Sequence, residues 1–433
     1  MVRRLFPRMS AWLSAVPDGR DPETCDYSGA ALFWTGILMY AARLGARRQI
    51  APWLRSEPVR RRLSLLAQEQ IVAVPHGDTL DDHLDTVDPA ALQKVSQQMA
   101  RALIESRRLE EFRLLDKHYL LTVDMSGHLY LGDSPSRFTQ GCLTQTTEDG
   151  RTFYYRPVCE AKLITRHGLA LSVGSEFVEN PPGFDPAGGL PQDSELPAAE
   201  RLFERVKRAF PGFSFCVLLD ARYCNEPTFA RCRRHDWRFI ITLKEGSLPS
   251  VWKEFQTLRH IAPQNRRIIV APDGVRYDFT WVNDIAYEEH TLHVLECRWK
   301  EPDGTPHRFV WVTDIRINAD NCDALAHEGG RQRWKIENNG FRAQKEEGFE
   351  MEHAYAKRTV AAKNFYLLLQ VAHMLCQLFE CYWRGKEAVK KAFGSLQNLG
   401  HFLLESLRRD PILDPEALRQ FLDEPIQIRM NSP

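Results

Sequence analysis

The sequence lacks three features that would narrow its function at once: a net charge, closely paired cysteines and an unbroken apolar segment. Its 57 lysines and arginines balance 57 aspartates and glutamates, so composition alone indicates no attraction to nucleic acid or to a membrane surface. The ten cysteines include no CxxC pair, which argues against a zinc site or a disulfide framework and favours a reducing compartment. The longest apolar stretch, residues 361–383, is interrupted by polar and charged side chains that are costly in hydrocarbon. We therefore expect a core helix there, no membrane span and, because the N-terminus does not resemble a secretory signal, a cytoplasmic protein.

The sequence does contain enough apolar material for a large globular protein, and its charges are unevenly distributed. With 433 residues, 43% of them hydrophobic, the chain can form two or three domains. Eleven arginines fall within the first 64 residues and outnumber the acidic residues there, whereas acidic side chains gather between Asp78 and Asp88. This segregation permits a basic, DNA-facing surface on a neutral protein. Solvated helix faces would give the same pattern, so the charge distribution alone does not distinguish a DNA-binding surface from an ordinary one.

Hydrophobic periodicity divides the chain into a helical part and a β-rich part. Apolar residues recur at helical spacing as far as residue 113. From His118 the runs HYLLTVD, HLYLG, TFYYRPVCEAKLITR and LALSVGSEFV predict three antiparallel strands. A helix opening at Glu195, the buried strand FSFCVLLD, a helix after Asn225 and the strand WRFIITLK follow. This order is typical of a ribonuclease-H-like α/β domain, in which helices flank a mixed sheet.

The remaining chain completes the expected domain organisation. Alternating segments from Arg266 to about Ile315 predict a β-rich insertion, and Asn321 is placed to cap the helix after it. We expect a helical N-terminal region for DNA binding or dimerisation (1–113), the first part of the catalytic domain (114–264), the β-rich insertion (265–318), the segment that completes the catalytic domain (319–383) and a C-terminal helical tail (384–433).

Two aspartates stand directly after apolar strands, where charge is costly unless a partner neutralises it. Asp124 ends the run YLLTVD, and Asp220 ends the run CVLLD. If the two strands are neighbours, both carboxylates meet at one edge of the sheet. Carboxylates that converge in this way can hold the two divalent ions used in phosphodiester cleavage and transfer. Each aspartate could equally be a turn former or a helix cap at the end of its strand.

A third carboxylate is expected from the segment GRQRWKIENNGFRAQKEEGFEMEHAY. Arg333 and Glu337 lie four residues apart and share one face of the predicted helix. Arg333 could hold the carboxylate in place or contact a phosphate with two parallel hydrogen bonds. Exposed salt bridges of this spacing are common on protein surfaces and contribute little stability, so the pair alone is weak evidence.

The run from Arg331 to Tyr355 resembles the C-terminal signature of bacterial insertion-sequence transposases of the DDE class, with a Y-R-E-K-type motif. Agreement extends to LLTVDMSG, QDSELPAAERL, VLLDARYCN, RFIITLK and WVTDI, so the resemblance covers about residues 75 to 383. It implies that Asp124, Asp220 and Glu337 bind two Mg²⁺ ions, for which Mn²⁺ substitutes, and catalyse DNA cleavage and strand transfer.

The same resemblance implies a set of DNA-binding side chains. Arg333 and Lys345 would contact the DNA backbone near the scissile phosphate, and Lys244 and Arg342 are further candidates for DNA contacts. Lys244 could also be an ordinary surface lysine. The implied partners are double-stranded DNA, as transposon terminal inverted repeats and as target, and a second copy of the chain in the DNA complex.

Three positions depart from the family pattern. Gly330 stands where the signature has its tyrosine, so any contact of that ring with transposon-end DNA is missing or supplied elsewhere. Gln344 lies seven residues after Glu337, and Lys345 comes one position later, which turns it away from the glutamate face of a straight helix. Met125 follows Asp124 where we expect glycine. These departures leave open whether excision uses a hairpin intermediate and whether this copy is active.

The leading hypothesis is therefore a cut-and-paste transposase. The alternatives are a domesticated or decayed derivative that binds DNA without cutting it, and a metal-dependent nuclease that does not join ends. Glu195 could add a fourth metal carboxylate, but glutamate also favours helix N-termini for electrostatic reasons. His353 is expected to pack in the interior. Aromatic residues of the N-terminal region are expected in the core rather than stacked on bases: Trp12, Phe33, Trp34, Tyr40 and Trp53.

Overall fold

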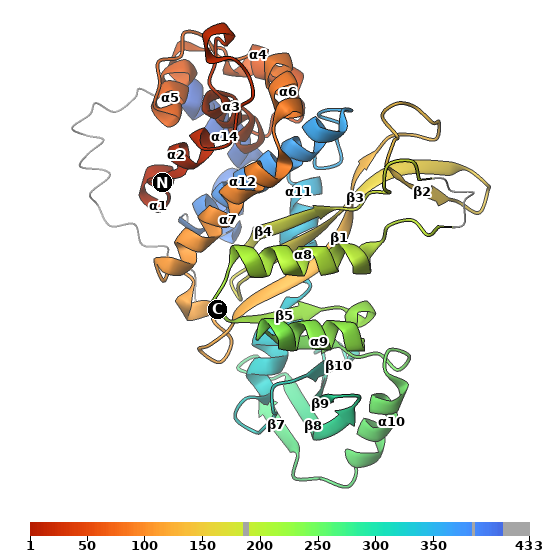
Figure 1. Ribbon diagram of the computed structural model, residues 1–433. Helices are drawn as coiled ribbons and strands as arrows, with labels where there is room; N and C mark the ends of the chain where they lie inside the picture. Colours follow the sequence, from red (N-terminus) through yellow and green to blue (C-terminus); the bar gives the residue numbers. More distant parts are fainter. Residues whose placement is uncertain (185–189, 383–385, 410–433) are drawn as a thin grey trace.

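The computed structural model describes residues 1–184, 190–382 and 386–409, and its shape is elongated (Figure 1). Helices from both ends of the sequence pack together at one end, and a β-sheet runs from the middle of the molecule to the other end. Within these ranges no helix is long and apolar enough to cross a membrane. None of the ten cysteines, all of which lie within these ranges, forms a disulfide.

The N-terminal region is helical, as the periodicity predicts, but it shares its core with the C-terminal part of the chain. The long helix α12 packs against α3, α6 and α7, and residues 30–40 of α3 are buried throughout. Region 1–113 is therefore not a separate globular unit. The bounds of these helices are α1 (Val2–Leu5), α2 (Met9–Ser14), α3 (Gly29–Ala41), α4 (Ile50–Leu54), α5 (Glu57–Ala67), α6 (Gly77–Thr86), α7 (Pro89–Glu105), α12 (Thr359–Tyr382), α13 (Lys386–Phe393) and α14 (Leu396–Arg409).

One mixed sheet of ten strands forms the centre of the fold, making this an α/β protein. Its strands are β1 (Tyr119–Tyr130), β2 (Leu143–Thr146), β3 (Thr152–Ile164), β4 (Ala170–Phe177), β5 (Phe215–Leu219), β6 (Arg238–Thr242), β7 (Arg266–Val270), β8 (Arg276–Tyr287), β9 (His290–Lys300) and β10 (Pro306–Thr313). The order is β2-β3-β1-β5-β6-β10-β9-β8-β7, and β4 pairs with β3. β1 is antiparallel to β3 and β3 to β4, whereas β1, β5 and β6 are parallel.

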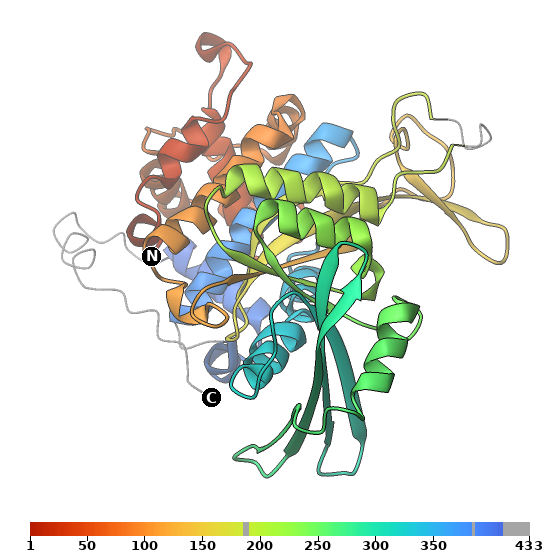
Figure 2. The same cartoon turned by 60° about the horizontal axis from the view of Figure 1, so that its bottom comes forward.

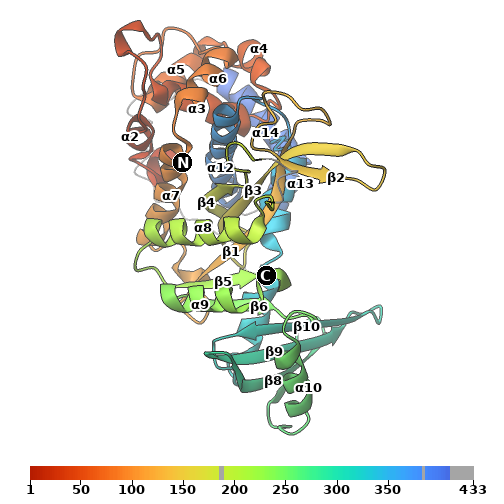
Figure 3. The same cartoon turned by 45° about the vertical axis from the view of Figure 1, so that its right-hand side comes forward.

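The strand predictions are confirmed, and the structure adds one short strand and one helix. The runs HYLLTVD and HLYLG are two halves of β1, so the predicted set of three antiparallel strands corresponds to β1, β3 and β4. The short strand β2 forms a hairpin with the first half of β3 and projects from the body of the molecule (Figure 3). A further helix, α10 (Pro249–Leu258), precedes the β-rich segment.

The β-rich segment after residue 264 continues the central sheet and does not form a sheet of its own. β10 pairs antiparallel with β6, with Trp311 opposite Thr242 and Thr313 opposite Ile240. In the sheet β6 lies between β5 and β10, so β10 satisfies the backbone hydrogen-bonding groups on the edge of β6 that β5 leaves open. The predicted insertion therefore extends the sheet beyond the strands that carry Asp124 and Asp220.

Two layers of helical structure cover the two faces of the sheet. Helices α8 (Glu195–Ala209) and α9 (Glu226–His235) lie side by side on one face (Figure 2). There Phe229 of α9 stacks on Phe239 of β6 at a centroid distance of 5.0 Å. On the other face Ile240 and Trp311 form a second hydrophobic cluster with Leu325.

The chain that crosses this second face is irregular. Ala324–Gly329 and Ile336–Arg342 are π-type helical turns, and the short α-helix α11 (Ala343–Glu346) follows. The predicted cap is wrong: the Asn321 side chain accepts from the Asn318 amide at 2.8 Å and donates to the Arg316 carbonyl at 2.9 Å instead. Such wide turns within helices are frequent at functional sites. The predicted C-terminal tail is helical as far as residue 409, and residues 410–433 lie outside the described part of the chain.

Candidate active site

Asp124 and Asp220 lie at equivalent positions on neighbouring parallel strands. Tyr119 to Thr122 of β1 pair with Phe215 to Leu218 of β5, and the Thr122 hydroxyl donates to the Leu218 carbonyl at 2.9 Å. Each aspartate follows two residues after this last pair. The two carboxylates therefore lie at the same level of the sheet, just past the paired part of β1 and β5, as the sequence pattern predicts. Asp220 follows the end of β5, but β1 continues to Tyr130, so the expectation that Asp124 ends its strand is wrong.

Asp220 also acts as a cap, which was the alternative reading of this residue. It precedes the short 3₁₀ turn Ala221–Tyr223, and its Oδ1 accepts from the Arg222 amide at 2.9 Å. One carboxylate oxygen is thus used to start the turn, while the side chain remains partly exposed. Capping fixes the rotamer of Asp220 and leaves the second oxygen available to a ligand.

Arg333 joins the other two predicted carboxylates. Its guanidinium contacts Asp124 Oδ2 at 3.3 Å and Glu337 Oε1 at 3.1 Å. The contact with Glu337 confirms the ion pair expected from the four-residue spacing. The contact with Asp124 connects the segment that crosses the sheet to strand β1, so Asp124 and Glu337 face the same cation.

Burial raises the pKa of Asp124 to about 7. The side chain is 18% exposed, and its loss of hydration outweighs the opposing effect of the Arg333 guanidinium. The carboxylates of Glu337 and Glu195 raise the pKa further. Several acidic groups therefore act on one another at this edge of the sheet, and an added cation would favour the ionised form of Asp124.

Glu195 belongs to the same group of carboxylates, although its place in the sequence made it only a weak candidate for metal binding. It begins α8 and is buried, with one oxygen accepting from the Tyr223 hydroxyl at 2.8 Å and the other paired with Arg222 at 2.5 Å. Arg222 follows Asp220 by two residues, so this ion pair links the first turn of α8 to the capped turn after β5. Its place at a helix N-terminus was the signal in the sequence, but that signal could not reveal the buried partners.

The remaining basic candidates lie outside these contacts. Lys345 pairs with Glu352 at 2.7 Å, and Arg342 pairs with Glu346 at 2.7 Å on the surface. Lys244 is exposed just after β6, which is the next parallel strand after the one that ends at Asp220. The structure thus brings Arg333 to the carboxylates directly, and it leaves the other three basic side chains on nearby or peripheral surface.

Two of the three altered positions, Gly330 and Gln344, have structural explanations. Gly330 packs on the ring of Trp311, and a Cβ at residue 330 would lie 2.5 Å from Trp311 Cε2. Trp311 therefore occupies the space that a side chain at this position would need. Gln344 is fully buried, so the position of the signature lysine faces the core in this chain, while Lys345 faces solvent.

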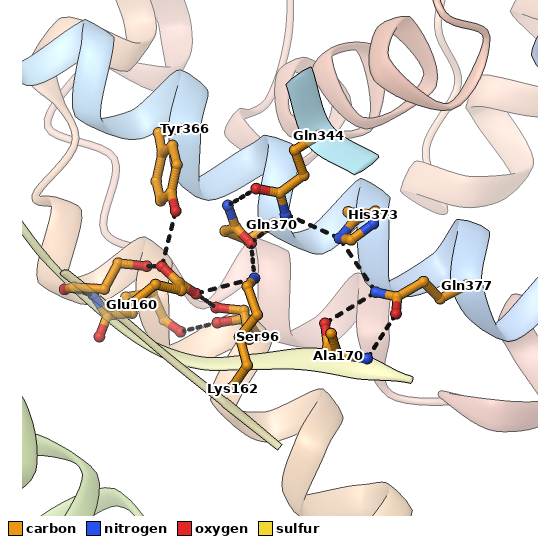
Figure 4. A network of polar contacts seen from close by, with 12 residues as sticks. Ser96, Glu160, Lys162, Ala170, Gln344, Tyr366, Gln370, His373 and Gln377 are labelled. Atoms are coloured by element: carbon orange, nitrogen blue, oxygen red, sulfur yellow. Dashed lines mark hydrogen bonds and ion pairs between the residues drawn. The ribbon is translucent and has the colours of Figure 1, made fainter. Parts of the chain in front are cut away.

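Gln344 takes part in a buried polar network that the sequence did not predict (Figure 4). It exchanges hydrogen bonds with Gln370 at 2.8 and 3.1 Å, and Gln370 accepts from Lys162 at 2.7 Å. Lys162 lies 3.5 Å from Glu160, which accepts from Tyr366 at 3.0 Å. The only trace of this network in the sequence was the set of polar residues within the apolar stretch 361–383.

The network lies on the Asp124 face of the sheet. Glu160 is the cross-strand partner of Asp124, and Lys162 is the partner of Thr122. The backbone of Gly340 rests on Lys162, whose Cε is 3.1 Å from the position of a Cβ at residue 340. Buried polar groups that are fully satisfied in this way rigidify their surroundings. The segment bearing Glu337 is therefore tied to strands β3 and β1 through polar contacts.

The other weak candidates fall into two groups. His353 is exposed and contacts the edge of Tyr355, so its expected place in the interior is wrong. Phe33, Trp34 and Tyr40 are core residues as expected and Trp12 is half-buried, whereas the Trp53 ring is 41% exposed beneath the Arg408 guanidinium.

No group of three or more histidine, cysteine, aspartate or glutamate side chains is arranged to hold a metal ion within residues 1–184, 190–382 and 386–409. Between Asp124 and Glu337 the guanidinium of Arg333 supplies the positive charge. A scan against protein-family models and a search of curated proteins find no match for this chain.

Proposed function

We propose that this protein is a DDE-class DNA transposase that binds transposon-end inverted repeats, cuts DNA and joins the freed ends to a target with Mg²⁺. The observation that carries the proposal is the convergence of Asp124 and Asp220 in register at one sheet edge, with Glu337 joined to Asp124 through Arg333. A salt bridge on an isolated helix would not reach an aspartate of strand β1, 209 residues away. The signature resemblance supports the same three carboxylates.

The strand arrangement supports a ribonuclease-H-like catalytic core. Three antiparallel strands (β4, β3, β1) followed by two parallel strands (β5, β6) form the order β4-β3-β1-β5-β6, with α8 between β4 and β5 and α9 between β5 and β6. We infer that β7 to β10 are an addition to that core and that the segment carrying Glu337 returns to it afterwards.

The donor set fits magnesium. Asp124, Asp220 and Glu337 offer oxygen ligands only, which are the ligands that Mg²⁺ and Mn²⁺ accept readily. The raised pKa of Asp124, caused by burial and by neighbouring carboxylates, means that a nearby cation would stabilise its ionised form. When bound, two such ions would activate the attacking oxygen and stabilise the leaving oxygen of the phosphodiester.

The side chains around the carboxylates would orient the DNA strand. Arg333 has five N–H donors and uses two contacts for Asp124 and Glu337, which leaves donors for a phosphate oxygen. We propose that it neutralises the carboxylates in the free protein and contacts the scissile phosphate in the complex. Lys244, exposed at the same edge of the sheet, would contact the backbone beside it, and Lys345 and Arg342 would contact DNA further away.

Gly330 makes the excision pathway a separate question. Trp311 fills the position that the signature tyrosine would need, so a tyrosine contact with the transposon end is lost at this place. We therefore propose that this chain cleaves and transfers DNA strands, without a hairpin intermediate that depends on the signature tyrosine. The arginine-rich N-terminal helices are the proposed surface for the inverted repeats, and a homodimer is the proposed state of the DNA complex.

Electrophoresis of a labelled duplex can separate the three candidate functions. The duplex should carry the inverted repeats found in the DNA that flanks the coding sequence. A transposase will retard it without metal, nick it with Mg²⁺ or Mn²⁺ and join the 3′ end to a supercoiled plasmid. Retardation without nicking would identify a binding-only derivative, and nicking without joining would identify a nuclease.

A further inference from the structure

The carboxylate of Glu337 is held only weakly by its own side-chain contacts. The side chain is 52% exposed, and it pairs with Arg333 at 3.1 Å. It belongs to the π-type turn Ile336–Arg342, where the backbone departs from regular α-helix. The position of the Glu337 carboxylate over the sheet therefore depends on the contacts of the residues before and after it, which hold the backbone of this turn.

Two side chains that flank Glu337 hold that backbone from the opposite side. Lys335 is buried, and its ammonium donates to the Thr165 carbonyl at 3.0 Å and to the Arg166 carbonyl. Asn339 donates to the Gly168 carbonyl at 2.8 Å. Residues two positions before and after Glu337 project away from it on a helical turn, so both anchors lie beneath the carboxylate.

These carbonyls belong to the turn between β3 and β4, which is itself well fixed. The Thr165 and Leu169 backbones pair at 3.1 Å, and the Thr165 hydroxyl accepts from the Leu169 amide at 3.1 Å. Gly168 has φ +94°, and a Cβ there would lie 2.8 Å from Asn339 Nδ2. The turn connects to β3, the strand in which Glu160 pairs with Asp124.

We propose that Asn339 and Lys335 are positioning residues, which fix Glu337 relative to Asp124 so that the carboxylates can bind divalent ions together. The proposal rests on the proposed function, because it assigns Glu337 to that ion site. Neither residue touches the reacting atoms. Each acts through the β3–β4 turn, and Gly340, which rests on Lys162, adds a third contact between the same segment and the sheet.

The affinity of the full chain for Mn²⁺ in the absence of DNA, measured by electron paramagnetic resonance, tests this proposal. Asn339→Ala removes one anchor, and Asn338→Ala is its matched control, because Asn338 is exposed at the neighbouring position. We expect Asn339→Ala to weaken Mn²⁺ binding about tenfold, the lower end of the effect of losing a residue that orients a metal ligand. Asn338→Ala should stay within twofold of the parent, and retardation of metal-free DNA should be the same for both variants.

The possible outcomes separate the positioning role from the proposed function. Equal Mn²⁺ affinities for Asn339→Ala and Asn338→Ala would overturn the positioning role while leaving the ion site in place. A parent chain that binds no Mn²⁺ would overturn the proposed function and the positioning role with it. Lys335→Met serves as the second variant: weakened Mn²⁺ binding with metal-free DNA retardation retained supports the proposal, and parent-like Mn²⁺ affinity contradicts it.

Discussion

Arg333 and Asp124 form an ion pair at 3.3 Å although 209 residues separate them in the sequence. The same guanidinium contacts Glu337 at 3.1 Å. This relationship ties the irregular segment after β10 to the first strand of the sheet, and it puts a cation between two carboxylates that the proposed function assigns to metal binding.

Replacing Arg333 should impair chemistry more than DNA binding. In Arg333→Ala the carboxylates lose their internal cation and the scissile phosphate loses a proposed contact, so we expect strand joining to fall about a hundredfold, as for loss of one electrostatic contact in an active site. The affinity for repeat-end DNA, measured by gel retardation, should fall less than tenfold. Arg333→Lys should not restore joining, because one ammonium cannot replace the two-pronged guanidinium. Single-turnover joining rates measure this, and an unchanged rate in Arg333→Ala would contradict it.

Asp124→Asn should stabilise the metal-free protein at high pH. The folded-state pKa of Asp124 is raised to about 7, whereas an aspartate in an unfolded chain titrates near 3.9. Between these values the folded protein holds a proton that the unfolded chain has lost, so this group lowers the stability of the parent progressively as pH rises from about 4 to 7. We expect the variant to be more stable by on the order of 2 to 4 kcal/mol at pH 8, and by little at pH 4.

Urea denaturation across pH measures this difference. Asp133→Asn is the matched control, because Asp133 is exposed in the loop after β1, and at pH 8 it should change the stability far less than Asp124→Asn does. Added Mg²⁺ should stabilise the parent more than the Asp124→Asn variant. A stability difference between Asp124→Asn and parent that shrinks as pH rises would have the wrong sign and would contradict the assigned environment.

Restoring the signature tyrosine at residue 330 should destabilise the protein. A Cβ at that position would meet the Trp311 ring. Even Gly330→Ala should therefore lower the free energy of unfolding by about 1 to 3 kcal/mol through overpacking, and Gly330→Tyr should lower it further. Gly246→Ala is the matched control, because nothing lies within 4 Å of its added Cβ. Thermal denaturation compares the three variants. Parent-like stability of Gly330→Tyr would show that Trp311 does not occupy this space in solution.

Moving the signature lysine back to position 344 should also fail. Gln344→Lys places an ammonium in a fully buried network that already contains Lys162. We expect the free energy of unfolding to fall by more than about 3 kcal/mol, as it does for other buried charges without a partner. Lys345→Ala removes a partly exposed ion pair with Glu352 and should cost less than about 1 kcal/mol. Chemical denaturation measures both changes. A stable Gln344→Lys protein would be evidence against a closed network.

The chain order of strands and helices could be predicted because it depends on local pattern. The runs before Asp124 and Asp220 are mostly apolar, which marks buried strands, and the helix α9 after Asp220 begins at a recognisable capping residue, Asn225. Asp220 has both of the roles that the sequence pattern allows. It caps the turn after β5, and it lies at the same level as Asp124 on the neighbouring strand.

The pairing of distant segments could not be predicted in the same way. Nothing in the sequence of β10 shows that it pairs with β6, so the predicted insertion turned out to be part of the central sheet. The π-type turns around Glu337 and the collision between residue 330 and Trp311 depend on tertiary contacts. The network of Lys162, Gln344 and Gln370 could not be predicted for the same reason, because its members come from three separate parts of the chain.

Mg²⁺-dependent joining of a pre-cut, labelled repeat-end duplex to plasmid, by the full chain and its carboxylate variants, tests whether the three carboxylates catalyse strand transfer. We expect joining by the parent and by Glu352→Gln, which changes a surface glutamate in the same signature. We expect less than about one-hundredth of the parent rate for Asp124→Ala, Asp220→Ala and Glu337→Gln, each with repeat-end binding retained. Joining at the parent rate in any of these three variants would contradict the assignment of that carboxylate, and parent-like joining in all three would refute the account.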